Sequence, residues 1–238
     1  MKQRADVALA KRGLVVSRSQ AESYIKLGKV RLNGKILNKS SILVSDDDQL
    51  KVEQDEQYVS RAALKLASVA QGLGLDFKGK VVLDAGSSTG GFTDYALRRG
   101  ARSVIAVDVG TQQLHPSLLT DDRIELHEKT DIRDFRPAVT PDIVVIDLSF
   151  ISLRQVLPHV SEIISKSTQV IAMVKPQFES SAKDVNKGVI KNDSIRRKIL
   201  KDFEQWVKPY FVITTKADSQ VAGEKGNLER FYLLRKSV

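Results

Sequence analysis

The sequence predicts an α/β fold with a doubly wound, mostly parallel sheet, preceded by a small α+β domain. Short runs of β-branched residues recur from residue 81 onward, each separated by a stretch long enough for a crossover helix. Two helical patterns and a hairpin signal occupy the first 45 residues. Most of the net positive charge of the chain is concentrated in the same 45 residues.

Composition excludes several classes of protein. The 238 residues include no cysteine and three histidines, and their net charge is +9. Zero cysteine rules out a disulfide scaffold, an iron–sulfur cluster, a thiolate zinc site and a cysteine nucleophile. With so few histidines we expect no metal. We also expect a cytoplasmic protein without membrane contact, because no apolar run approaches the roughly 20 residues of a membrane helix and no secretory signal is present.

The charge pattern defines two domains. Residues 1–45 carry a net charge of +8, whereas residues 46–57 carry −5. We therefore expect a small domain with an acidic linker at 1–58 and a larger domain at 59–238. The aspartates at 46–48 could form a metal site, but charge runs are more often solvated, so we interpret them as the end of the module and a linker.

The small domain begins with two predicted helices. The first presents Val7, Leu9 and Ala10 as an apolar stripe and ends at Gly13. Ser17 and Gln20 form a capping box that opens a second helix, which buries Ala21, Tyr24 and Ile25 and ends at Gly28.

A hairpin follows at Asn33-Gly34, between Val30–Leu32 and Ile36–Leu37. A helical cap with a solvated basic face would fit this pattern. Contact with nucleic acid is the favoured interpretation, because basic residues gather at the helix ends and the hairpin. These residues are Arg12, Arg18, Lys29, Arg31 and Lys35.

Two motifs with many fixed spacings cover this module. They are Arg4-x-Asp6-x-x-Leu9-x-x-Arg12-Gly13-Leu14 and Ser17-Arg18-x-x-Ala21-x-x-x-Ile25-x-x-Gly28-x-Val30-x-Leu32-Asn33-Gly34. The module resembles the RNA-binding domain of ribosomal protein S-four and its relatives. The resemblance implies binding to structured RNA through the basic helix pair. The candidate RNA contacts are Arg4, Lys11, Arg12, Ser17, Arg18, Lys29, Arg31, Asn33 and Lys35.

In the larger domain, a glycine-rich segment follows the first strand-like run, Val81–Leu83. It runs from Asp84 to Thr93 as Asp-Ala-Gly-Ser-Ser-Thr-Gly-Gly-Phe-Thr. Small residues let the backbone approach a ligand closely, and a helix that starts near Gly91 turns its N-terminus toward that ligand. The dinucleotide fingerprint requires glycine where this chain has Ser88.

Acidic residues end the first three strands. Asp108 follows the second strand and is placed to accept hydrogen bonds from ribose hydroxyls. Asp131 follows a third strand, Ile124–His127, and could contact an adenine amino group or cap a loop. An acid before a glycine-rich loop favours S-adenosylmethionine over NAD, because the former carries an ammonium group and a cationic sulfur. An NAD oxidoreductase stays possible at this point.

The next two strands, Ile143–Ile146 and Val170–Val174, end in Asp147 and Lys175. Because parallel strands end at one edge of a sheet, both side chains should emerge beside the glycine-rich segment. A buried ion pair that serves only structure is the alternative to a functional pair. Tyr210–Thr215 and Arg230–Leu234 predict two final strands that form an antiparallel edge.

Six blocks spread over the chain carry a wider resemblance. They are Tyr58–Leu66, Val81–Thr93, Ala106–Gly110, Asp147–Ser152, Val174–Glu179 and Gly226–Glu229. Together they resemble the TlyA-type RNA methyltransferases, historically labelled haemolysins, in which an S-four-like domain precedes an FtsJ-like catalytic domain. The resemblance implies a class I methyltransferase fold with a seven-stranded sheet. It also implies 2′-O-methylation of a ribose, expected to be that of a cytidine, in ribosomal RNA or a ribosomal subunit.

Site residues follow from the same resemblance. It implies a catalytic tetrad of Lys65, Asp147, Lys175 and Glu229. For S-adenosylmethionine it implies contacts from Asp84, Gly86, Ser87, Ser88, Thr89, Gly90, Phe92, Thr93, Asp108, Val109, Asp131 and Ile132. The family usually has two glycines where this chain has Ala62-Ala63, and a Gly-Gly pair where it has Lys187-Gly188. The change at Ala62-Ala63 could narrow the approach of the substrate beside Lys65.

The implied chemistry suits these side chains. A ribose hydroxyl attacks a methyl group only after it loses its proton, and the reaction therefore needs a base. We expect Lys175 to act as that base or to steer the alkoxide, Lys65 to orient the hydroxyl, and Asp147 and Glu229 to fix the two ammonium groups. The missing cysteine also closes the thiolate route to 5-methylpyrimidines.

The sequence is compatible with two further functions. One is that of an RNA-binding factor whose methyltransferase fold has lost activity. The second is that of a membrane-active haemolysin, which the missing membrane segment disfavours.

Overall fold

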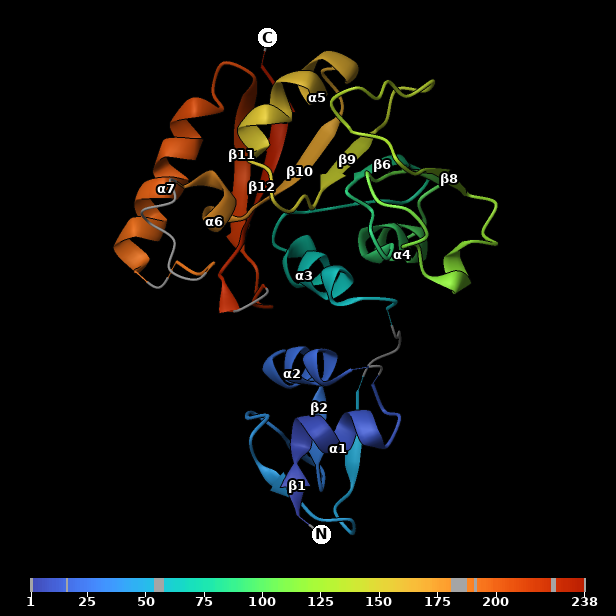
Figure 1. The fold of residues 1–238 in the computed structure, drawn as a ribbon, viewed down its shortest axis with the longest axis vertical. Coiled ribbons are helices and arrows are strands. Elements are labelled where there is room, and N and C mark those ends of the chain that lie inside the picture. The colour runs from blue at the N-terminus through green and yellow to red at the C-terminus, as the bar shows by residue number, and fades with distance from the viewer. Residues whose placement is uncertain are drawn as a thin grey trace.

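The computed structural model describes residues 2–15, 17–53, 58–180, 188–190, 192–223 and 226–237. A small N-terminal domain lies below a larger α/β domain in Figure 1. The two meet where helix α2 (Arg18–Lys26) packs against α3 (Arg61–Ala70). Residues 54–57 lie outside the described residues, so the boundary between 58 and 59 stays a prediction.

The two predicted helices of the small domain form, but the inner face of the first differs in part from the prediction. Helix α1 (Ala5–Lys11) buries Ala5, Ala8 and Leu9, whereas Val7 and Ala10 are only partly covered. The predicted stripe of Val7, Leu9 and Ala10 is confirmed for Leu9, which is buried, and for Ala10, which packs against the core, and it is wrong for Val7. The helix begins directly after strand β1 at residue 5, and the spacing from 5 to 8 and 9 then gives the inner face.

The predicted N-terminal cap of α2 is confirmed, with a modification. Ser17 Oγ accepts a hydrogen bond from the backbone N–H of Gln20 at 3.2 Å. The Gln20 side chain donates to the carbonyl of Tyr58 at 3.3 Å, so it links the two domains. At the other end, Gly28 has φ of +68° and ends the helix as predicted.

Short antiparallel strands complete the small domain. Strand β2 (Val30–Leu32) lies between β3 (Lys35–Ile36) and β5 (Leu50–Val52), whereas β1 (Gln3–Arg4) pairs with β4 (Leu43–Val44). The predicted hairpin is confirmed, because Asn33 and Gly34 both have the positive φ of a type I′ turn.

The acidic stretch is folded as part of the small domain through residue 53, and its linker part stays a prediction because residues 54–57 lie outside the described residues. Asp48 accepts hydrogen bonds from the N–H and hydroxyl of Ser45 and from Asn33, and β5 follows it in the sheet. These bonds fix a turn, which explains why an aspartate stands there. No group of three or more acidic or histidine side chains among the described residues could hold a metal ion.

The larger domain contains the predicted seven-stranded, mostly parallel sheet. The strand order is β11-β12-β10-β9-β6-β7-β8, and β12 is the reversed strand, one place in from the edge. The strands are β6 (Val81–Ala85), β7 (Ser103–Val107), β8 (Ile124–His127), β9 (Ile143–Ile146), β10 (Gln169–Val174), β11 (Phe211–Asp218) and β12 (Arg230–Lys236). The predicted strands are thus confirmed, and the last two extend a few residues further.

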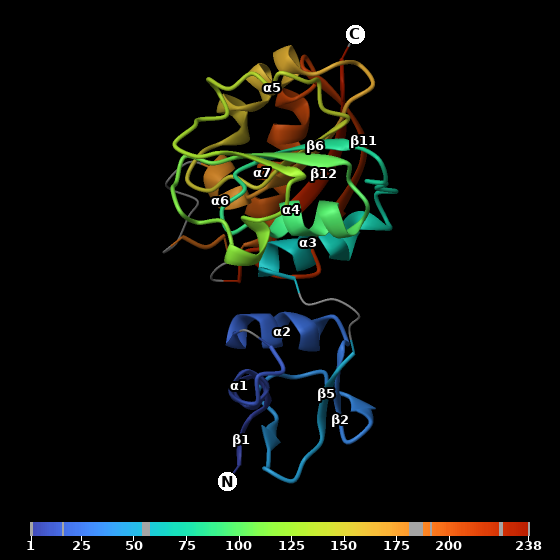
Figure 2. The ribbon, with the colours of Figure 1, turned by 90° about the vertical axis from the view of Figure 1, so that its right-hand side faces the viewer.

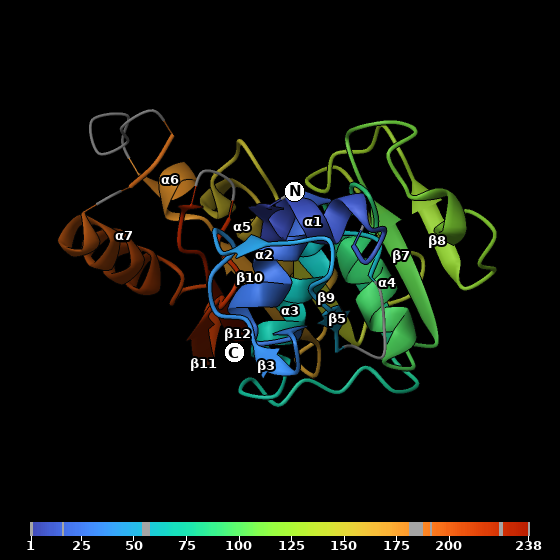
Figure 3. The same ribbon diagram turned by 90° about the horizontal axis from the view of Figure 1, so that it is seen from below.

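Helices cover both faces of this sheet. Helices α3 and α4 (Gly91–Arg98) lie between the sheet and the small domain in Figure 2, while α5 (Leu157–Ile163) lies on the opposite side. α7 (Asp193–Trp206) packs with α5 in the core of that opposite face through Leu200 and Phe203. Seen from below in Figure 3, the small domain lies beneath the middle of the sheet.

The expected crossover helices are absent after β7 and after β8. Residues 108–142 contain only a short 3₁₀ turn (Pro116–Leu118) and strand β8. This segment holds Gly110 and three prolines, at 116, 137 and 141, which interrupt helix formation. The helices in the described parts of the chain are too short or too polar to cross a membrane.

Candidate active site

A cavity of about 710 Å³ opens at the carboxyl ends of β6, β9 and β10. The three strands are neighbours in the sheet, so the residues that end them converge on one place. Its lining includes ten of the predicted site residues: Lys65, Asp84, Gly86, Ser87, Ser88, Thr89, Phe92, Asp147, Lys175 and Glu229.

Two lysine–carboxylate pairs face this cavity. Lys175 Nζ lies 2.6 Å from Asp147 Oδ1, and Lys65 Nζ lies 2.7 Å from Glu229 Oε2. Both lysines are buried apart from the part that lines the cavity, and Glu229 is only 2% exposed. The pairing therefore removes four charges from most of the solvent while leaving them at the wall of an open site.

Lys65 reaches the cavity because α3 lies unusually close to α4. Ser60 Oγ caps α3 by accepting from the N–H of Ala62 at 3.3 Å. A side chain at Gly91 would place its Cβ 2.2 Å from Ser60 Oγ and 2.8 Å from the Ala62 methyl. Ala62 itself lines the cavity, while Ala63 is fully buried, so only the first of the two alanines can touch a substrate.

Glu229 is held by a turn before β12. Its carbonyl accepts from the N–H of Ser219, and Gly223 leaves room for its carboxylate, because a Cβ there would lie 2.3 Å from Glu229 Oε1. Nearby, Asn227 donates to the carbonyl of Gly188 at 2.8 Å. Lys187 lies outside the described residues.

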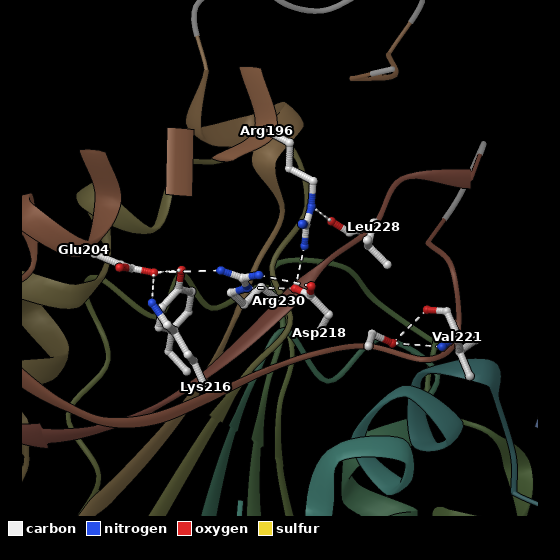
Figure 4. A network of polar contacts seen from close by, with 9 residues as sticks. Arg196, Glu204, Lys216, Asp218, Val221, Leu228 and Arg230 are labelled. Atoms are coloured by element: carbon white, nitrogen blue, oxygen red, sulfur yellow. Dashed lines mark hydrogen bonds and ion pairs between the residues drawn. The ribbon is translucent and has the colours of Figure 1, made fainter. Parts of the chain in front are cut away.

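A partly buried charge network supports the same turn from outside. In Figure 4, Arg196 extends from α7 to the carbonyl of Leu228 and to the carboxylate of Asp218. Arg230 binds the same carboxylate at 2.7 Å, and its guanidinium together with that of Arg196 holds the pKa of Asp218 below its usual range. The network ties α7, β11 and β12 together on either side of Glu229.

The glycine-rich loop turns sharply against β9. Gly86 has φ of +87°, and a Cβ there would lie 2.8 Å from the Asp147 carbonyl. Asp108 fixes the loop, since its two carboxylate oxygens accept from the N–H groups of Ser88 (2.8 Å) and Gly110 (2.7 Å). Each oxygen keeps a second lone pair for a ligand hydroxyl.

Asp84 lies at the floor of the cavity, and one of its two carboxylate oxygens accepts no hydrogen bond from the described residues. Thr93 Oγ1 donates to its Oδ2 at 2.7 Å, while its Oδ1 has no partner among the described residues. Burial raises the pKa of Asp84 to about 7, the Thr93 hydrogen bond opposes that change, and the carboxylate of Asp147 reinforces it. No cationic side chain in the described part of the chain pairs with Asp84, so this carboxylate is open to a cationic ligand.

The other predicted ligand contacts lie beside the cavity rather than in its wall. Gly90 and Thr93 support the loop, as the cap and first turn of α4. Val109 is 67% exposed, and Ile132 is buried in the core. Asp131 binds Arg133 and caps its own loop, as the loop-capping interpretation of the sequence predicts. Contact of Asp131 with adenine stays a prediction.

Sequence reasoning missed several cavity residues that follow the strand ends. They are Ser149, Phe150, Gln177 and Phe178. Phe150 is 88% exposed with φ of +66°, a backbone region that bulky residues rarely adopt, and its ring lies 5.3 Å from that of Phe178. An aromatic residue just beyond a buried strand was the available signal.

The predicted RNA contacts divide into two groups. The first group has bonds within the domain: Arg12 binds the carbonyls of Ser45 and Asp48, and Arg31 pairs with Glu53. The other members of this group are Arg4 and Arg18, which bind buried Asp6, together with Asn33 and the helix cap Ser17. The second group has exposed side chains without a hydrogen bond or ion pair among the described residues: Lys11, Lys29 and Lys35.

A second cavity of about 350 Å³ lies between α2 and the larger domain. It shares Ser19 and Arg61 with the main cavity, so the two cavities adjoin. Lys26 and Arg61 line this second cavity, and neither has an ion-pair partner in the described part of the chain.

The strand order, the glycine turn and the paired lysines define an α/β methyltransferase domain. It follows a small basic domain along the chain. Comparison with family models agrees: residues 58–236 match the FtsJ-like methyltransferase family and residues 3–50 match the S4 domain. The chain belongs to the FtsJ-like methyltransferase family.

Three relatives resemble the chain over nearly its full length. The 23S rRNA (cytidine-2′-O)-methyltransferase TlyA of Campylobacter jejuni is 37% identical, over 96% of this chain and 98% of the relative. The 16S/23S rRNA (cytidine-2′-O)-methyltransferase TlyA of Mycobacterium tuberculosis is 39% identical, over 98% and 89%. A solved structure from Streptococcus thermophilus, named as a hemolysin, is 36% identical with a TM-score of 0.74, over 99% and 89%.

Proposed function

We propose that this protein transfers the methyl group of S-adenosylmethionine to the 2′-hydroxyl of a cytidine in ribosomal RNA, in the cytoplasm. The relatives named for that reaction support the substrate class. The observation that carries the proposal is the meeting of two lysine–carboxylate pairs in one cavity beside the glycine-rich loop.

The residues around the loop fit the cofactor. Asp84 Oδ1 is buried and without a partner among the described residues, and it would receive the ammonium group at the amino-acid end of S-adenosylmethionine. Gly86 lets the loop pack against the carbonyl of Asp147, which a Cβ there would meet at 2.8 Å, and Asp108 would accept from the ribose. When bound, the cofactor supplies a methyl group made electrophilic by a cationic sulfur.

The chain's own residues prepare the nucleophile. Lys175, in its neutral form, accepts the proton of the 2′-hydroxyl at Nζ, and Asp147 holds the resulting ammonium at 2.6 Å. Lys65 directs a second N–H group toward the developing alkoxide, and Glu229 fixes its position. All four side chains are present and paired, which favours an active enzyme over an inactive RNA-binding factor.

Two surfaces would bring RNA to this site. The exposed lysines at residues 11, 29 and 35 would provide contacts to phosphates on the small domain, and Lys26 and Arg61 of the second cavity would continue that charge toward the main cavity. At the cavity, Phe150 presents an exposed ring on which an unstacked base could lie. A target nucleotide within a helix would have to leave its stack to reach Lys175.

Methyl transfer to ribosomal RNA tests the proposal. Purified protein and labelled S-adenosylmethionine should place 2′-O-methyl groups at defined cytidines, and Lys175→Ala should slow the transfer by about 10²–10⁴-fold. Lys166→Ala is the matched control, because this lysine is exposed near the opposite end of β10. Absence of any 2′-O-methyl group after reaction with the wild-type protein would refute the proposal.

A further inference from the structure

Lys175 has a second acceptor besides Asp147. Its Nζ donates to Ser149 Oγ at 2.8 Å, and Ser149 lines the same cavity. Ser149 Oγ has no other hydrogen bond among the described residues. An ammonium group carries three N–H bonds, so the two acceptors leave one direction for a third group.

The loop that carries Ser149 is fixed at both ends. At its start, the N–H of Asp147 donates to the carbonyl of Ala85 at 3.1 Å. At its end, Glu179 accepts from Ser152 Oγ at 2.6 Å and from the N–H of Leu153 at 2.7 Å. Because Glu179 belongs to the helix that directly follows Lys175, these bonds hold the serine loop and the lysine to one another.

The conformation of the loop also has an energetic cost. Phe150, directly after Ser149, has φ of +66°, which costs of order 1 kcal/mol or more for a bulky side chain. Such strain persists only where surrounding bonds determine the conformation, and it is often found at functional sites. The same turn places the hydroxyl of Ser149 beside Lys175 Nζ.

We propose that Ser149 is a positioning residue for Lys175 in the methyl-transfer reaction. Ser149 and Asp147 together fix rotation about the Cε–Nζ bond of Lys175. The third bonding position of Nζ, which neither residue occupies, then points to the ribose hydroxyl. The O–H bond of the substrate breaks, the new N–H bond forms at that third position, and the other two N–H groups stay on Ser149 and Asp147. This inference rests on the proposed function.

Kinetics of three variants test the role. Ser149→Ala should lower kcat roughly tenfold with little change in KM for RNA, because misdirection of the base affects the reacting geometry rather than binding. Ser149→Thr keeps the hydroxyl and should restore most of kcat. Ser167→Ala is the matched control, since this serine is exposed at the far end of β10.

An NMR measurement without substrate tests the hydrogen bond itself. The ¹³Cε signal of Lys175, assigned with Lys175→Arg, should move in Ser149→Ala relative to the wild type at one fixed pH, because Lys175 Nζ loses the Ser149 acceptor. The other charged groups that line the cavity stay unchanged: Arg61, Lys65, Asp84, Asp147 and Glu229. This measurement needs no methyl transfer, so it distinguishes failure of this inference from failure of the proposed function.

Three outcomes would overturn the positioning role. One is wild-type kcat together with an unchanged ¹³Cε signal of Lys175 in Ser149→Ala. Another is an increase in KM alone, which would make Ser149 a substrate contact. The third is failure of Ser149→Thr to recover activity, which would mean that the hydroxyl is not the group that matters.

Discussion

Replacement of Asp84 by asparagine should stabilise the protein while weakening its binding of S-adenosylmethionine. The carboxylate is fully buried, one oxygen has no partner among the described residues, and Asp147 lies near enough to repel it. A buried charge without a cationic partner destabilises the folded chain, yet the same charge would attract the ammonium group of the ligand.

The size of the effect follows from the pKa of Asp84. It rises from 3.8 to about 7 on folding, and each pH unit corresponds to about 1.4 kcal/mol. The folded state therefore binds the proton more tightly, and the destabilisation develops as pH rises from about 4 to 7 and is constant above that. At pH 8 it amounts to about 4 kcal/mol at most, which asparagine would remove.

Thermal unfolding of the ligand-free protein measures this directly. The Tm of Asp84→Asn should exceed that of the wild type by several degrees at pH 8, and the difference should shrink toward zero near pH 4. Calorimetry at pH 8 should show at least about tenfold weaker binding of S-adenosylmethionine. A variant that is less stable at pH 8, or a Tm difference independent of pH, would refute the argument.

Three further predictions concern function and folding. Phe150→Gly should raise Tm slightly, because glycine tolerates a φ of +66°, while methyl transfer falls; unchanged transfer in a kinetic assay would exclude a role for the ring. Arg12→Ala should lower the free energy of unfolding by about 1–3 kcal/mol, because it leaves carbonyls of the 45–48 turn without a donor. Lys29→Ala should instead leave stability unchanged and reduce the salt dependence of RNA binding. Denaturant unfolding and RNA binding at several salt concentrations distinguish the two variants. Glu229 acts by holding Lys65, so Glu229→Gln should lower kcat about as much as Lys65→Ala. Additive losses of kcat in the variant that carries both substitutions would argue that the two residues have separate roles.

Local patterns predicted much of the fold. The hairpin at Asn33-Gly34 and the cap at Ser17 depend on backbone geometry within a few residues, so the residue types specify them. The parallel strands were also recognisable, because burial on both faces demands apolar runs. The inner face of α1 is predicted only in part, with Val7 wrongly included, since its phase depends on where the helix begins after β1.

The site was only partly predictable. Asp147 and Lys175 could be chosen because they end adjacent strands, and the structure places them 2.6 Å apart. Lys65 and Glu229 came from family resemblance alone, since no local spacing relates a helix residue to one 164 positions later. Phe150 and Ser149 went unnoticed although they stand three and two residues from Asp147, because only the turn of the loop directs them into the cavity.

The sequence by itself determined which residues could form strands, turns and a basic module, because these properties depend on neighbours along the chain. Tertiary structure decided which charges are free. Arg12 and Lys29 look alike in the sequence, but folding binds the first to backbone carbonyls and leaves the second exposed. It also leaves Asp84 Oδ1, at the cavity floor, without a hydrogen-bond partner among the described residues, because burial and pairing depend on residues that meet only in the folded chain.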